Sequence, residues 1–160
     1  PEQPHPAARP AVHHHLDDTP DFYLDQVAQV VMDRWSSGRV GLLGDAACCS
    51  SPMSGGGTGL ALVGAYLLAG ELAAADWDPD AGFAGYEARM RPYVEANQEI
   101  GRLHVQSRGV GASDAEPVPE PDLDALMELV DRAINGVELP DYAGVPDYGP
   151  TAARPITAGP

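Results

Sequence analysis

A glycine-rich segment between two apolar runs constrains the fold of this chain more than any other feature. Residues 39–44, RVGLLG, form a short apolar run that ends in glycine, which is typical of a buried strand. Residues 45–59 are mostly small and include four glycines within the last five positions. In residues 60–75, leucines and valines recur near one face of a helix. The sequence therefore predicts a strand, a glycine-rich loop and a helix, in that order.

A loop of this kind suits the binding of a polar or anionic cofactor. Glycine lets backbone amides approach a ligand closely, and the N-terminus of the next helix offers unpaired N–H groups and the positive end of the helix dipole. All nine basic residues are arginine, so no lysine completes a P-loop, and no G-x-G-x-x-G triplet fits these glycines. A nucleophile elbow is also excluded, because Pro52 stands where that motif requires a glycine before Ser54.

Composition limits the expected partners and compartment. The 160 residues suffice for one domain or for part of a larger one. Nine basic against 24 acidic residues give a net charge of −15, which repels nucleic acids and anionic membranes. The longest apolar stretch, residues 59–75, contains Glu71 and is shorter than the ~20 residues that span a bilayer, so we expect a soluble protein. Cys48 and Cys49 are adjacent, where a mutual disulfide would be strained, which favours a cytoplasmic location.

The rest of the chain is interpreted from composition and periodicity. Residues 1–20 hold five prolines and suit a linker or the end of a preceding helix. In residues 22–35, β-favouring and polar residues interleave, which predicts a hairpin or a long strand with one wet face, before a turn at 36–38. The remaining expectations are a helix at about 80–105 kinked or split by Pro92, a proline-rich connection at 107–121, a helix at 123–134 and a disordered tail from 143.

The order and spacing of these motifs resemble a known family. The segments GRVGLLGDAA and SPMSGGGTGLALVGAYLLAGEL are similar to the second FAD-binding motif of the class A flavoprotein monooxygenases, the aromatic hydroxylases of the p-hydroxybenzoate hydroxylase fold. The resemblance extends upstream to DFYLDQVAQVVMDRWSSGRV and downstream to YEARMRPYVEANQ and ELPDY. These flanks look like the subgroup of tetracycline-degrading and polyketide-tailoring oxygenases. The resemblance covers residues 20 to 142.

The resemblance implies a mixed α/β fold, the C-terminal part of a Rossmann-like flavoprotein that binds FAD and NAD(P)H. The FAD-binding part would span residues 21–142, after a linker or substrate-domain helix end at 1–20 and before a disordered tail at 143–160. The family's first motif, the G-x-G-x-x-G turn for the ADP half of FAD, and its middle Asp-Gly motif are absent from this sequence. The expected partner is therefore an N-terminal half of the flavoprotein, from the same gene or a second chain.

Carried over position by position, the resemblance assigns cofactor contacts, no metal ligand and no catalytic residue. Asp45 matches the aspartate that hydrogen-bonds the ribityl chain of FAD, and Gly44 lets the strand end turn towards the cofactor. Pro52 matches a proline beside the flavin ring. The expected site is completed by Gly55, Gly57, Thr58, Gly59 and Leu60. The backbone of residues 57–59 would donate near the pyrimidine edge of the flavin.

The implied activity is that of an NAD(P)H-dependent hydroxylase, an oxidoreductase. In this family NAD(P)H reduces FAD, and O2 is then used to hydroxylate an electron-rich aromatic or polyketide-like small molecule. Residues 22–32 would lie in the substrate-binding region. This chain departs from the family at Gly56, where many relatives have a polar residue such as Gln, and at Cys48, where an aromatic residue or His is common.

Other interpretations stay open. The chain could be a non-catalytic remnant or assembly module of this fold, or a relative of flavin-dependent halogenases whose catalytic lysine comes from the absent half. Asp45 alone could be a loop cap, and glycine runs alone are often plain turns. Cys48 and Cys49 are better explained as small buried residues than as nucleophiles. His13–His15 are better explained as a solvated or tag-like stretch than as a metal site.

Overall fold

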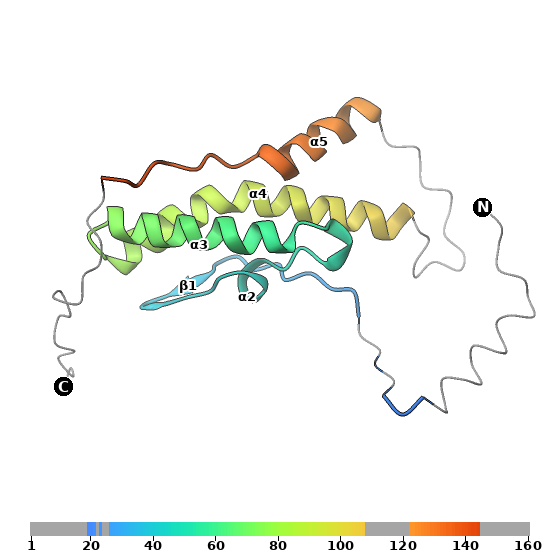
Figure 1. The fold of residues 1–160 in the computed structure, drawn as a ribbon, viewed down its shortest axis with the longest axis horizontal. Helices are drawn as coiled ribbons and strands as arrows, with labels where there is room; N and C mark the ends of the chain where they lie inside the picture. The colour runs from blue at the N-terminus through green and yellow to red at the C-terminus, as the bar shows by residue number, and fades with distance from the viewer. Residues whose placement is uncertain (1–18, 22, 24–25, 108–121, 145–160) are drawn as a thin grey trace, which may run out of the picture.

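The computed structural model describes residues 19–21, 23, 26–107 and 122–144. Its elements are β1 (Ser36–Ser37), β2 (Val40–Gly41), α2 (Asp45–Cys48), the 3-10 helix η1 (Pro52–Ser54), α3 (Gly57–Ala74), α4 (Pro79–Ser107) and α5 (Leu123–Asn135). Figure 1 shows α3 and α4 side by side, with β1, β2 and α2 on one side of the pair and α5 on the other. The described part is mixed and mostly helical. The predicted linker, connection and tail lie almost wholly outside it.

The pair of helices α3 and α4 forms the core. The buried cluster consists of Trp35, Ala47, Cys48, Leu60, Leu67, Tyr86, Met90, Tyr93 and Val94. The helix predicted at 60–75 begins earlier, at Gly57. Gly64 gives α4 close access to α3, because a Cβ there would be 3.5 Å from Met90 Cε. α4 runs unbroken through Pro92, so this proline does not split the helix.

The strand predicted for residues 22–35 is wrong for the part that the structure describes. Residues 26–34 form neither strand nor helix. Side chains of α4 bind their carbonyls in place of a neighbouring strand: Gln98 Nε2 donates to Val30 O at 2.8 Å, and Arg91 donates to two further carbonyls. A strand needs a partner strand for its backbone groups, and here side chains take that place. The interleaving of apolar and polar residues does not mark a buried face either, because Val27 and Val31 are 52% and 72% exposed.

The apolar run at residues 39–44 is not a buried strand. It contributes only β2, which pairs with β1 in an antiparallel hairpin that has Ser37 opposite Val40. The turn predicted at 36–38 lies at 38–39 instead. Val40 is 65% exposed, since no other strand among the described residues pairs with this hairpin. A parallel, Rossmann-like sheet therefore stays a prediction.

Trp35 fixes the hairpin to α4. Its side chain is 2% exposed, its ring centroid lies 5.7 Å from that of Tyr86, and the guanidinium of Arg91 lies 4.7 Å from the centroid on the ring face. The backbone N–H of Trp35 donates to Glu87 Oε2 at 3.1 Å, and Glu87 also forms an ion pair with Arg91. An aromatic contact, a cation–π contact and a hydrogen bond to a carboxylate thus converge on one buried residue.

The helix predicted at 123–134 is confirmed as α5, but its apolar face is divided. Leu129 is buried on the side where α5 packs against α4, and Val130 is half-buried. Three other apolar residues of the helix face solvent, namely Leu123, Met127 and Ile134. Asn97 of α4 reaches α5 through a 3.0 Å hydrogen bond from its Nδ2 to Ala133 O.

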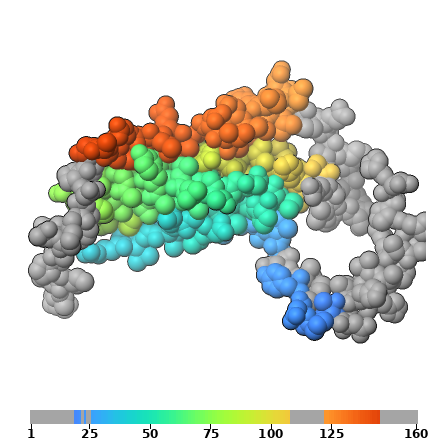
Figure 2. Space-filling view, viewed as in Figure 1, coloured from blue at the N-terminus to red at the C-terminus, as the bar shows by residue number. Residues whose placement is uncertain are grey.

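After α5 the chain returns along α3. The Tyr66 hydroxyl donates to Pro140 O at 2.6 Å, and the Tyr142 hydroxyl donates to Glu71 Oε1 at 2.6 Å. A Cβ at Gly70 would lie 2.1 Å from the Tyr142 ring, so only glycine permits this approach. The space-filling view shows the stretch that follows α5 lying along the helical pair (Figure 2).

Among the described helices, α3 alone is long and apolar enough to cross a membrane. One face of this helix lies in the core. Leu67 is fully buried in the cluster shared with α4, and Glu71 near the C-terminus of α3 pairs with Arg89 at 2.6 Å. Packing against α4 accounts for that face only, because 22% of the helix is buried and Leu62 and Tyr66 are 68% and 44% exposed.

Candidate functional site

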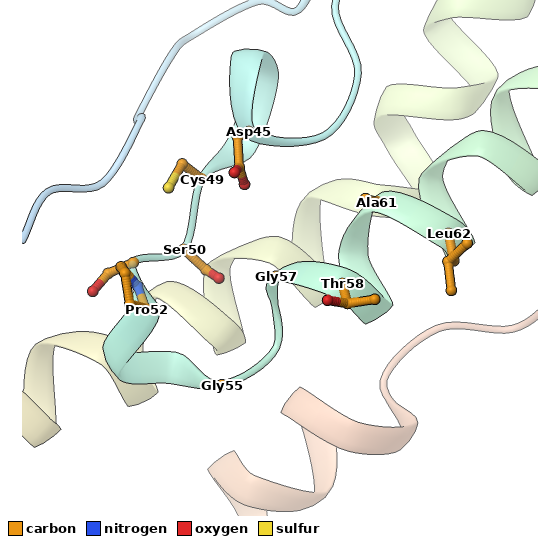
Figure 3. A pocket seen from close by; sticks show the side chains of 10 residues that line it. Asp45, Cys49, Ser50, Pro52, Gly55, Gly57, Thr58, Ala61 and Leu62 are labelled. Carbon is orange, nitrogen blue, oxygen red and sulfur yellow. The ribbon is translucent and has the colours of Figure 1, made fainter.

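An open pocket of about 580 Å³ lies between α2, η1 and the N-terminus of α3 (Figure 3). It is lined by Asp45, Cys49, Ser50, Ser51, Pro52, Gly55, Gly57, Thr58, Ala61 and Leu62. Five of the predicted site residues are in this lining: Asp45, Pro52, Gly55, Gly57 and Thr58. One pocket thus brings together residues from both ends of the glycine-rich loop.

The other three predicted residues stand behind the lining. Gly44 precedes α2 and has a φ of 61°, a value that glycine adopts without strain. Leu60 is 2% exposed and belongs to the core. Gly59 faces α4, where a Cβ would be 3.6 Å from the Tyr93 hydroxyl. These positions shape the backbone around the pocket and do not line it.

Asp45 supplies the negative charge of the pocket. It is the first residue of α2, and its exposed side chain projects towards the N-terminus of α3 (Figure 3). No donor from the described part of the chain binds its carboxylate, so both oxygens can accept hydrogen bonds from a ligand. A hydroxyl-rich ligand segment is the chemistry that this carboxylate suits.

The N-terminus of α3 supplies hydrogen-bond donors at the other side of the pocket. Gly56 is the N-cap and offers no side chain, and the first helical hydrogen bond runs from Leu60 N to Gly56 O. The amides of the first turn therefore have no intrahelical acceptor. Gly57 lines the pocket, and a Cβ there would meet no atom of the described residues within 4 Å, so this part of the helix N-terminus has room for a ligand. Electron-rich ligand atoms would be favoured there.

Buried polar residues of α4, which sequence reasoning missed, support the loop. Asn97 is 3% exposed, and a Cβ at Gly56 would be only 2.0 Å from Asn97 Oδ1. This chain has glycine at position 56, where many members of the family have a polar residue, because Asn97 of α4 leaves no room for a side chain there. Gln98 is 5% exposed, and its Nε2 lies 3.5 Å from Cys49 O. The sequence holds one signal for these residues: Asn97 and Gln98 are adjacent side-chain amides in a helix whose other buried residues are apolar or glycine.

Cys48 is a structural residue, as the sequence predicts. Its side chain is 1% exposed, and its thiol donates to Gly44 O at 3.3 Å. Burial, aided by the charge of Asp45 and by Cys49, raises the pKa of the Cys48 thiol to about 11. A thiol that stays protonated is a poor nucleophile. The described residues contain no group of three or more potential metal ligands, and His13–His15 lie outside them.

Several known proteins that are similar to this chain are flavoproteins. Residues 11–99 match a family described as an FAD binding domain. The chain is 39% identical over 127 residues to a flavin-dependent monooxygenase of Legionella longbeachae, which covers 79% of this chain and 33% of that protein. It is 53% identical over 134 residues to an FAD-dependent monooxygenase of Sarocladium schorii, which covers 79% and 32% respectively.

Among solved structures, the tetracycline destructase Tet(55) superposes with a TM-score of 0.62 at 39% sequence identity. The match covers 83% of this chain and 35% of that one. The chain therefore spans about a third of the length of the relatives that it matches.

Proposed function

Because the chain belongs to the family of FAD-binding domains found in flavin-dependent monooxygenases, whose cofactor is FAD, we propose that it forms the C-terminal FAD-binding portion of such an enzyme. The complete enzyme would hydroxylate an aromatic or polyketide-like small molecule with NAD(P)H and O2 in the cytoplasm. The observation that carries this proposal is one pocket with an acceptor carboxylate at one side and unpaired helix N–H groups at the other. Both cysteines are free thiols, in keeping with a reducing compartment.

The lining of the pocket fits the flavin half of FAD. The carboxylate of Asp45 would accept hydrogen bonds from ribityl hydroxyls, and the amides of Gly57 and Thr58 would donate to the polar edge of the ring. Pro52 and Leu62 give apolar surface for the ring itself. When bound, FAD would supply the electron transfer and the oxygen chemistry. The positive end of the α3 dipole favours negative charge in the pocket, so it would raise the reduction potential of the flavin.

A second protein segment would be needed to bind the ADP half of FAD. The sequence has no G-x-G-x-x-G turn, which holds the pyrophosphate at a helix N-terminus in dinucleotide-binding folds. We propose that an N-terminal segment with this motif completes the site, and we call the two together the complemented chain.

Replacement of Asp45 tests the proposed site. One hydrogen bond to a charged group contributes about 1.5–3 kcal/mol, so Asp45→Ala should weaken FAD binding to the complemented chain by about one to two decades. Quenching of flavin fluorescence during a titration measures the dissociation constant. Glu95→Ala is the matched control, because Glu95 is an exposed acidic residue of α4 outside the pocket lining.

Two results would contradict the proposal in different ways. Equal FAD affinity for Asp45→Ala and the unsubstituted chain would remove Asp45 from the site. A complemented chain with no flavin absorbance would favour the non-catalytic remnant.

A further inference from the structure

Ser51 lines the pocket with a backbone conformation that serine rarely adopts. Its φ is 78° and its ψ is 146°. A positive φ brings the Cβ against the backbone carbonyl, and its combination with an extended ψ is occupied almost only by glycine. Pro52 accounts for the ψ, because the residue before a proline is driven towards extended values. The positive φ needs another explanation, since no glycine stands at this position.

Hydrogen bonds within the loop hold Ser51 in place. Its Oγ accepts from Met53 N–H at 3.1 Å, and its carbonyl accepts from the Ser54 hydroxyl at 2.9 Å and from Ser54 N–H at 3.1 Å. The Ser54 hydroxyl also accepts from Gly56 N–H at 3.1 Å. These bonds join the strained residue to the N-cap of α3.

The preceding residue, Ser50, is held by hydrogen bonds from a half-buried residue outside the loop, Gln29. Gln29 Nε2 donates to Ser50 O at 3.0 Å and to Gln98 O at 2.7 Å. α4 touches the same peptide, because a Cβ at Gly101 would be 2.6 Å from Ser50 O. Ser50 is fully buried and Ser51 is 5% exposed. Such surroundings over-determine the backbone, which is the condition under which strain persists in a folded protein.

From these contacts we propose that Ser51 is a positioning residue: the surrounding contacts hold it at a strained φ, and its Oγ and carbonyl hold the pocket loop in its ligand-binding shape before the ligand arrives. The proposal rests on the proposed function, because the ligand is taken to be FAD. The strain makes the free energy of folding less favourable. The contacts that hold the loop raise the FAD affinity, because a loop that is already ordered loses less conformational freedom when FAD binds.

Two substitutions at this position separate the strain from the side chain. Ser51→Ala removes the Oγ but keeps the Cβ at positive φ, whereas Ser51→Gly removes both. Relative to Ser51→Ala, Ser51→Gly should raise the folding equilibrium constant about fivefold, because relief of strain outweighs the greater freedom of the unfolded chain. It should also strengthen FAD binding to the complemented chain by up to about fivefold, because the same relief favours the ligand-binding shape over loop conformations with negative φ. A purely structural residue would change the stability and leave the FAD affinity of the folded protein unchanged.

Asp76→Gly is the control for strain relief outside the site. Asp76 has a φ of 51° in the turn between α3 and α4, at the opposite end of α3 from the pocket. This variant should gain stability and keep the FAD affinity of the unsubstituted protein. In the free 160-residue chain, amide hydrogen exchange at Met53 and Ser54 should be slower in Ser51→Gly than in Ser51→Ala, and should equal that of the unsubstituted chain in Asp76→Gly.

The outcomes distinguish this inference from the proposed function. Equal FAD affinity of the two Ser51 variants, or equal loop exchange, would overturn the positioning role. If the unsubstituted complemented chain binds no FAD, the proposed function fails. Urea unfolding and hydrogen exchange of the free chain would then still decide whether Ser51 sets the shape of the loop.

Discussion

At the scale of single residues, the two adjacent thiols have opposite environments. Cys48 is buried with a raised pKa, whereas Cys49 is half-buried and lines the pocket. We expect one thiol of the native chain to react readily with a thiol reagent at pH 8, and peptide mapping to place the label on Cys49. Cys48 should react only after unfolding, because its thiolate is disfavoured and its sulfur is covered.

The variant Cys49→Ser provides the control, since it should leave the native chain almost unlabelled while the denatured chain takes up one label. Rapid labelling of Cys48 in folded Cys49→Ser would contradict the structural role assigned to this residue.

At the scale of elements, the first turn of α3 is open towards the pocket. A Cβ at Gly57 would meet no atom of the described residues within 4 Å, so Gly57→Val should fold with a free energy of unfolding within about 1 kcal/mol of the original. The added methyl groups would occupy the space in front of the helix N-terminus. We therefore expect the purified complemented chain to be folded and colourless, as measured by circular dichroism and flavin absorbance.

Gly64→Val is the comparison within the same helix. A Cβ at Gly64 would be 3.1 Å from Leu43 Cδ1 on the core side, so overpacking should destabilise the protein by about 1–3 kcal/mol. The folded fraction of this variant should still be yellow. Full flavin occupancy in Gly57→Val would show that the loop does not cradle the cofactor.

Helices were predictable from the sequence because their signals are local. Apolar spacing located α3, α4 and α5. The strands at 22–35 and 39–44 were not predictable, since pairing depends on partners that a local pattern does not contain. Five pocket-lining residues followed from the family resemblance. The hydrogen bond from Gln29 to Gln98 did not, because it joins residues 69 positions apart.

At the scale of the whole molecule, the pocket side of the chain carries uncovered apolar residues. Val40 is 65% exposed, Leu62 is 68% exposed and Leu43 is 36% exposed. Without a covering segment, this surface favours self-association. We expect the 160-residue chain alone to be colourless or prone to aggregation, and to bind FAD only when a segment with G-x-G-x-x-G is present. Size-exclusion chromatography and flavin absorbance, with and without that segment, measure both properties.

The rate of NADPH oxidation with a phenolic substrate, measured with and without that segment, tests whether the segment is also needed for activity. Stoichiometric flavin binding and turnover by the chain alone would refute the need for a second segment.

The burial of Trp35 gives the molecule an optical signal of its own. Indole emission depends on solvent contact, and Trp35 is 2% exposed while the second tryptophan, Trp77, is 41% exposed. The loss of tertiary structure moves Trp35 into water and shifts its emission to longer wavelength, whereas Trp77 changes less. Trp35 is absent from the pocket lining, so fluorescence follows the folding of the α3–α4 core in every variant of the loop without an added label.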